Sequence, residues 1–314
     1  MKALKIIFAG TPEFSVPCLN ALATSQHQLQ AIYTQPDRPA GRGRKLQISA
    51  VKQQAQILGL QVLQPQNFKQ DLDIELLKSF APDIMIVIAY GLILPQRVLE
   101  IPTLGCINVH GSLLPRWRGA SPIQQAILHG DSATGITIMH MDKGLDTGNI
   151  LMQISCSIDK QNSAQLYTLL ANIAVEPLLT TLEKITTGQI HAEAQNDNYA
   201  TYAPKINKTD AFINWQQKAI EIERKIRAFN PQPIAYTIAK GISIRIYQAC
   251  VIKNNHNKTP GTILAIDKHG MLVAANEDAV LIERLQFPGA KSLTVAEWLN
   301  AANVQLTVDL VLGL

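Results

Sequence analysis

The first 150 residues alternate short apolar runs with longer segments of helical spacing, and this alternation constrains the fold more than any other feature. The apolar runs predict strands over residues 4–9, 29–34, 83–89 and 105–110. The segments between and after them predict helices over residues 14–24, 49–58, 71–80 and 122–129. Strands that alternate with helices in this way are typical of a doubly wound, mostly parallel sheet. Residues 83–89 are apolar nearly throughout, as expected for a strand buried on both faces.

The pattern changes near residue 188, and we expect the chain to divide there. Strands over 135–140 and 149–154 and a long helix over 163–187 complete the first part. Residues 189–208 are polar and irregular, and after them one helix (219–228) precedes five short strands separated by glycines. That pattern favours a small β-barrel of the OB type, with a small sandwich as the alternative. We therefore predict an α/β protein: a Rossmann-like domain over 1–188, a linker over 189–208 and an OB-type barrel over 209–314.

Composition excludes several classes of protein. A hydrophobic fraction of 47% and a charged fraction of 17% fit a soluble globular chain. No apolar run approaches the roughly 18–20 residues of a membrane span, and the N-terminus lacks the features of a signal peptide. The four cysteines are isolated, without a C-x-x-C pair, so neither a metal site nor a redox motif is expected. We expect a cytoplasmic protein with reduced cysteines and no metal.

Basic residues are unevenly distributed along the chain. Residues 1–204 carry 15 basic and 15 acidic residues, whereas residues 205–314 carry 13 and 9. The second part is therefore mildly basic, which is compatible with a polyanionic partner. A loop over residues 34–46 also holds four cations with two glycines and two prolines. Such a loop suits phosphate binding, because arginine offers a fork of donors and glycine allows close approach, although a solvated loop is the alternative.

Three polar residues are candidates for chemistry. Asn108 and His110 lie two apart where a predicted strand ends, so their side chains point to the same face. Asp146, in the polar turn 141–148, could fix the tautomer of His110 and stabilise its charged form if that turn folds over the strand. The residues alone leave a purely structural role open. The first strand-to-helix turn lacks the G-x-G-x-x-G fingerprint, which argues against a dinucleotide-dependent oxidoreductase.

These motifs together resemble the methionyl-tRNA formyltransferases, and the resemblance extends over essentially the whole chain. It rests on residues 8–12, the loop 35–43, and residues 87–91, 107–116, 141–148 and 227–231. It implies that Asn108, His110 and Asp146 form a catalytic trio. It also implies that a turn contacts the folate, namely Ser112, Leu113, Leu114 and Pro115. Arg42 matches a loop arginine that enters the acceptor-stem region. Besides Arg42, seven further cations are expected to contact tRNA: Arg38, Arg44, Lys45, Lys205, Lys208, Arg224 and Arg227.

The resemblance implies a reaction: transfer of the formyl group of 10-formyltetrahydrofolate to the α-amino group of methionyl initiator tRNA. Folate would be a cosubstrate, and we expect a monomer without membrane attachment. Formyl transfer to an amino-sugar nucleotide and hydrolysis of the same folate to formate are alternatives, and the basic loop argues against both. A non-catalytic RNA-binding protein with an OB fold is a further alternative, and the intact trio argues against it.

Overall fold

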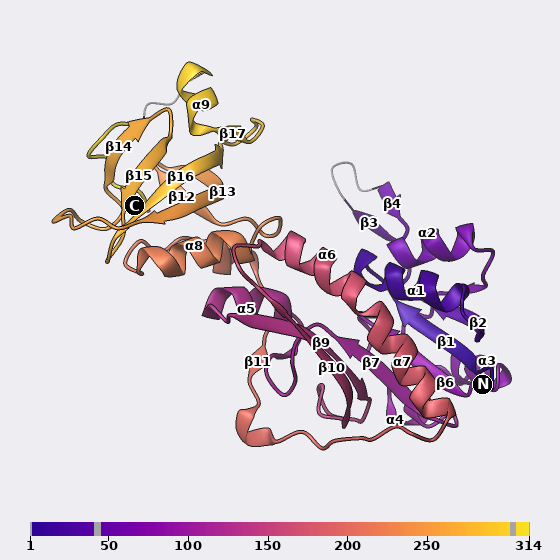
Figure 1. Cartoon of the computed structure of the whole chain (residues 1–314). Helices are drawn as coiled ribbons and strands as arrows, with labels where there is room; N and C mark the ends of the chain where they lie inside the picture. The colour runs from indigo at the N-terminus through magenta and orange to yellow at the C-terminus, as the bar shows by residue number, and fades with distance from the viewer. Residues whose placement is uncertain (1, 41–44, 302–305, 314) are drawn as a thin grey trace. The chain divides into compact units, whose positions relative to one another are not determined.

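The structure, a computed structural model, describes residues 2–40, 45–301 and 306–313 (Figure 1). The chain forms two compact units. Unit 1 comprises the chain up to Pro122 together with Ala133–Cys156 and Tyr167–Ala203. Unit 2 comprises Ile123–Ser132, Ser157–Leu166 and the chain from Pro204 onward. In the part of the chain that the structure covers, we find no helix long and apolar enough to cross a membrane.

Unit 1 is built on a seven-stranded sheet that confirms the predicted α/β class. Its strand order is β10 (Ile150–Ser157), β9 (Ala133–His140), β7 (Cys106–His110), β6 (Ile84–Ile88), β1 (Lys5–Gly10), β2 (Gln28–Tyr33) and β5 (Val62–Leu63). The five strands from β7 to β5 run parallel, and β9 pairs with β7 in antiparallel fashion. Every residue of β6 is buried, in agreement with its apolar sequence.

The helices of unit 1 follow local signals in the sequence. They are α1 (Val16–Ala23), α2 (Ala50–Ile57), α3 (Asp71–Ser79), α4 (Gln96–Leu99), α6 (Ser163–Ile173) and α7 (Val175–Thr186). Ser49 caps α2 by accepting a hydrogen bond from the Lys52 amide. The prediction of one long helix over 163–187 is wrong, because α6 ends at Ile173. Pro177 has no amide hydrogen for the Ile173 carbonyl, and its ring clashes with that carbonyl in a regular helix.

Two segments without a predicted element contain short strands. In the basic loop, β3 (Arg38–Ala40) pairs with β4 (Lys45–Gln47), and residues 41–44 between them lie outside the described residues. In the segment predicted as a linker, Glu193 bridges to Ile150, and β11 (Tyr202–Ala203) pairs with β8 (Arg118–Gly119). Residues 189–203 therefore contact the strands and loops of unit 1.

Unit 2 is an antiparallel sheet that curls as a half-barrel, in agreement with the predicted small barrel of OB type. Its strands are β12 (Tyr236–Ala239), β13 (Ile242–Ile252), β16 (Ala279–Gln286), β15 (Gly270–Ala274) and β14 (Ile263–Asp267), in that order, with β17 (Leu293–Thr294) paired to β16. Its helices are α5 (Pro122–His129), α8 (Ala219–Ala228) and α9 (Val295–Ala301). Ile222 and Ile226 of α8 and Trp298 of α9 are buried in one apolar core with inward-facing residues of the strands.

Candidate active site

The three candidate catalytic residues meet at the carboxyl end of β7. His110 is the last residue of β7, and Asn108 projects from the same face two residues earlier. The loop between β9 and β10 brings Asp146 to them. Its Oδ1 lies 3.4 Å from Asn108 Nδ2, and its Oδ2 lies 3.7 Å from His110 Nδ1. Ligand sites of open parallel sheets form at this edge of the sheet.

A backbone carbonyl fixes the orientation of the imidazole. His110 Nε2 lies 2.9 Å from the carbonyl oxygen of Trp117, and the ring is buried. Because a carbonyl can only accept, Nε2 carries the hydrogen in this contact. Nδ1 is therefore the ring atom that faces Asp146 and can gain or release a proton there.

The carboxylate of Asp146 has a donor at each oxygen, Asn108 Nδ2 at Oδ1 and the Gly119 amide at Oδ2. Its Oδ2 accepts a hydrogen bond of 2.8 Å from the Gly119 amide, and its side chain is only 14% exposed. The backbone of Asp146 has φ of 55°, in the left-handed region that residues with a side chain seldom adopt. An amide donor, an imidazole nitrogen and an oriented carboxylate thus share one site, the set of groups needed to hold a carbonyl oxygen and move a proton.

The neighbouring thiol does not supply a nucleophile. Cys106 begins the same strand, and burial raises the pKa of its thiol to about 12. Only the thiolate is an effective nucleophile, so this cysteine is inert at neutral pH. The geometry favours direct attack by a nucleophile that belongs to the substrate.

The turn expected to contact folate is rigid. Thr137 of β9 donates through Oγ1 to the Ser112 carbonyl (2.6 Å) and accepts from the Leu114 amide (3.0 Å). Gln153 of β10 donates to the Leu114 carbonyl (2.9 Å), and Ser112 Oγ donates to the Arg116 carbonyl (2.6 Å). Ser112 and Leu114 are buried, whereas Leu113 and Pro115 are partly exposed. The side chains of Leu113 and Pro115 are therefore the ones left accessible to a ligand.

The residues expected to contact tRNA come from both units of the chain. Arg38 is exposed on β3, and Lys205 and Lys208 are exposed after β11. Arg42 and Arg44 lie outside the described residues, and so does the side chain of Lys45. Exposed cations suit contact with a phosphate backbone, because such contacts depend on charge more than on detailed geometry.

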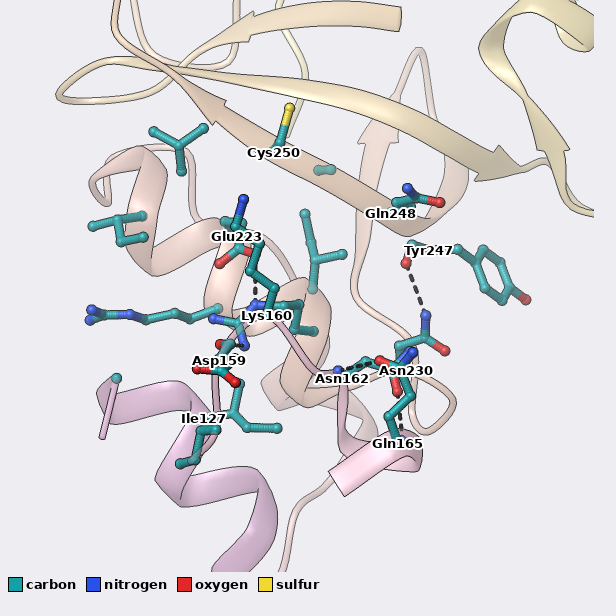
Figure 2. Close-up of a pocket in the computed structure, with 18 of the residues that line it drawn as sticks. Ile127, Asp159, Lys160, Asn162, Gln165, Glu223, Asn230, Tyr247, Gln248 and Cys250 are labelled. Atoms are coloured by element: carbon teal, nitrogen blue, oxygen red, sulfur yellow. Dashed lines mark hydrogen bonds and ion pairs between the residues drawn. The ribbon is translucent and has the colours of Figure 1, made fainter. Parts of the chain in front are cut away.

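Arg224 and Arg227 line a pocket of about 930 Å³ within unit 2, with both polar and apolar side chains in its walls. Figure 2 shows its walls, with Glu223 on α8, Gln248 and Cys250 on β13, and Asp159 and Lys160 in the segment before α6. The Arg227 guanidinium is bound internally, through Nε to Glu223 (2.6 Å) and Nη1 to the Gln161 carbonyl (3.0 Å). Arg224 packs over Gly130, where an added Cβ would fall 2.1 Å from the guanidinium carbon.

Sequence reasoning missed two residues of the site, Arg118 and Gln195. Gln195 belongs to the segment predicted as a linker, and it donates hydrogen bonds to two carbonyls of the loop that carries Asp146. Arg118 is 2% exposed and donates to Gln195. Neither contact has a local sequence signal, because Gln195 is 77 residues from Arg118 and 47 to 49 residues from the loop carbonyls that it binds.

Comparisons with known proteins match the sequence of this chain to one family. Residues 2–181 match the family model described as Formyl transferase, and residues 205–303 match Formyl transferase, C-terminal domain. A methionyl-tRNA formyltransferase from Legionella pneumophila (strain Paris) is 56% identical over 313 residues, covering 99% of this chain and 100% of that protein.

Two solved structures share the fold at low sequence identity. HypX from Aquifex aeolicus in complex with tetrahydrofolic acid is 19% identical, with a TM-score of 0.65 over 95% of this chain. The chain spans 47% of the length of HypX. Methionyl-tRNA formyltransferase from Clostridium thermocellum is 17% identical, with a TM-score of 0.56 over 80% of this chain and 95% of that one. Both family models and the full-length relative agree, and the chain belongs to the formyl transferase family.

Proposed function

We propose that this protein transfers the formyl group of 10-formyltetrahydrofolate to the α-amino group of methionyl initiator tRNA, with Asn108, His110 and Asp146 carrying the chemistry. The full-length Legionella relative supports the reaction and its substrates. One observation supports the catalytic assignment above all others: Asp146 lies within 3.4 Å of the Asn108 amide nitrogen and 3.7 Å of His110 Nδ1.

The reaction begins when the free α-amine of the methionyl group attacks the formyl carbon. The carbonyl oxygen gains negative charge as the new carbon–nitrogen bond forms, and Asn108 Nδ2 donates a hydrogen bond to it. The contact between Asn108 and Asp146 is long, at 3.4 Å, so this donor is weakly engaged in the free protein. Removing one such donor commonly lowers a rate by about 10²–10³.

Collapse of the intermediate breaks the bond between the formyl carbon and N10 of the folate. Asp146 accepts the proton that the attacking amine loses and passes it, directly or through water, to N10 as that nitrogen departs. His110 presents Nδ1 to the same space, because Nε2 is held by the Trp117 carbonyl. A proton on Nδ1 makes the ring a cation beside the Asp146 carboxylate, and this cation also stabilises the oxyanion.

The remaining predicted residues position the two substrates. Leu113 and Pro115 offer accessible apolar surface beside the trio for the folate, on a turn held rigid through Ser112 and Leu114. Arg38, Arg42, Arg44, Lys45, Lys205, Lys208, Arg224 and Arg227 bind the phosphates of tRNA. For Arg227 this role requires that a phosphate replace or join its present partners. The proposal includes action as a monomer in the cytoplasm, and sedimentation at assay concentrations tests the monomer.

One assay tests the function. Purified protein is mixed with 10-formyltetrahydrofolate and one of three RNAs: methionyl initiator tRNA, uncharged initiator tRNA, or methionyl elongator tRNA. We expect formyl-methionine on the charged initiator alone, with one folate consumed per formyl group transferred. Release of formate without transfer would overturn the proposal in favour of a hydrolase. Equal formylation of both charged tRNAs would overturn the specificity for the initiator.

A further inference from the structure

The loop that carries Asp146 depends on a side chain from a distant segment. This loop joins β9 to β10 and has no regular structure between residues 141 and 149. Gln195 Nε2 donates to the carbonyl of Asp146 (2.9 Å) and to the carbonyl of Gly148 (2.8 Å). Both hydrogens of one amide group therefore hold the backbone on either side of Thr147.

A buried arginine holds the other end of the same amide. Gln195 Oε1 accepts from Arg118 Nε (3.0 Å) and from Arg118 Nη2 (2.8 Å), and Nη2 also donates to Asp197 (2.8 Å). Because a guanidinium can only donate, Oε1 must face Arg118 and Nε2 must face the loop. Each hydrogen-bonding position of the Gln195 side chain is thus filled, and its orientation is determined.

The arginine is linked to Asp146 by a second route. Gly119, the next residue, donates its amide to Asp146 Oδ2 (2.8 Å). The Arg118 amide donates to the Thr201 carbonyl (2.9 Å), which ties this strand to the segment that also carries Gln195. Arg118 and Gln195 together hold the backbone of Asp146, while Gly119 holds its carboxylate.

We infer that Gln195 and Arg118 are positioning residues for formyl transfer: they fix the catalytic loop so that the Asp146 carboxylate faces His110 Nδ1 and Asn108. The left-handed φ of 55° at Asp146 persists only where the surroundings hold it, and the two Gln195 hydrogen bonds are such a restraint. This inference rests on the proposed catalytic role of Asp146. Neither residue touches the reacting atoms, so both act through Asp146.

Gln195→Ala tests the inference by removing the four hydrogen bonds that join Gln195 to Arg118 and to the loop. We expect kcat to fall about 10- to 100-fold, because a small displacement of a reacting group is enough to cost that much. The KM values for folate and tRNA should stay within about twofold of wild type, since no binding residue is changed. Gln189→Ala is the matched control: this glutamine is exposed on the same segment, and its loss should leave kcat unchanged.

Gln195→Glu separates positioning from stability. The glutamate keeps an acceptor for Arg118, so the buried guanidinium stays paired and this source of instability in Gln195→Ala is absent. The other oxygen, however, would face the carbonyls of Asp146 and Gly148 and repel them. We expect kcat to fall at least as far as in Gln195→Ala. Wild-type kcat in the glutamate variant would overturn the inference, even if the alanine variant folds poorly.

A double variant shows whether the effect passes through Asp146. In an Asp146→Ala background, adding Gln195→Ala should change the single-turnover rate by less than about twofold, because residues that act as a unit are not additive. A further loss as large as that in the wild-type background would overturn the inference and indicate general loosening of the fold. The proposed function is checked by the same series: if Asp146→Ala transfers at the wild-type rate, the assignment of Asp146 itself fails.

Discussion

The site around Asp146 and the basic hairpin β3–β4 lie in the same unit but are built in opposite ways. In the site, His110, Asp146, Arg118 and Gln195 each have fixed partners and are largely buried. On the hairpin, Arg38 is exposed. The difference matches two physical tasks: transferring a group requires donors held in place before reaction, whereas binding a phosphate backbone requires charge and reach.

The base of the hairpin is nevertheless anchored. Lys52 Nζ donates to Asp37 Oδ2 (2.6 Å) and to Gln64 Oε1 (2.7 Å), and Gln64 Nε2 donates to Asp37 Oδ1 (2.8 Å). Asp37 directly precedes β3, so this network fixes the point from which the basic residues extend. The comparison therefore predicts that changes in the site lower the rate of reaction, whereas changes at the hairpin weaken the use of tRNA.

The largest of the expected losses after that of Asp146 belongs to Asn108, the proposed oxyanion donor. Asn108→Ala should lower kcat by about 10²–10³, because it removes a donor aimed at developing charge. The affinity for tRNA, measured by filter binding, should remain normal. Asn149→Ala is the control, since this asparagine is exposed beside the same loop. An increase in the KM for tRNA with unchanged kcat would place Asn108 in binding rather than in chemistry.

A smaller loss, confined to folate, is expected from Thr137→Val. Valine keeps the shape of threonine but leaves the buried Leu114 amide without its acceptor, which commonly costs about 1–3 kcal/mol. The KM for 10-formyltetrahydrofolate should rise about tenfold if the Ser112–Pro115 turn contacts folate, and the KM for tRNA should not change. Thr134→Val on the same strand is the control, because its buried hydroxyl has no hydrogen-bond partner. A folate KM equal to that of wild type would remove the turn from the folate site.

The smallest effect is expected at the base of the hairpin. Lys52→Met removes the cation that binds both Asp37 and Gln64 and should raise the KM for tRNA about threefold, in keeping with a partly exposed ion pair. The kcat should be unchanged, and so should the salt dependence of tRNA binding, because the hairpin cations remain. If the plot of log tRNA affinity against log salt concentration became less steep by about one, Lys52 itself would contact a phosphate. Lys69→Met, at an exposed lysine, is the control.

Much of the fold could be predicted because the signals are local. The predicted helix 219–228 coincides with α8, and the predicted helix 49–58 contains α2. The break between α6 and α7 was missed because the apolar spacing continues across it, although Pro177 gives the signal. The hairpin β3–β4 was missed because glycines, prolines and charges dominate its composition.

The site was predictable only in part. The spacing of Asn108 and His110 on a strand placed them together, and the polar turn 141–148 made Asp146 a candidate partner, a role that the family resemblance also implied. Nothing local indicates that the loop 141–148 folds over β7, or that Gln195 returns from a distant polar segment to hold it. Such contacts arise from tertiary packing, and a polar, aperiodic segment gives no pattern from which to infer them.

The rate of the chemical step in Asp146→Asn tests the central claim most directly. Asparagine has nearly the same shape and can still accept the Gly119 amide, but it carries no charge and cannot take up the amine proton. With both substrates saturating in a single-turnover experiment, we expect the transfer rate to fall by about 10²–10⁴, with normal affinity for tRNA. Asp142→Asn, at an exposed position of the same loop, should transfer at the wild-type rate. Wild-type transfer by Asp146→Asn would contradict the account.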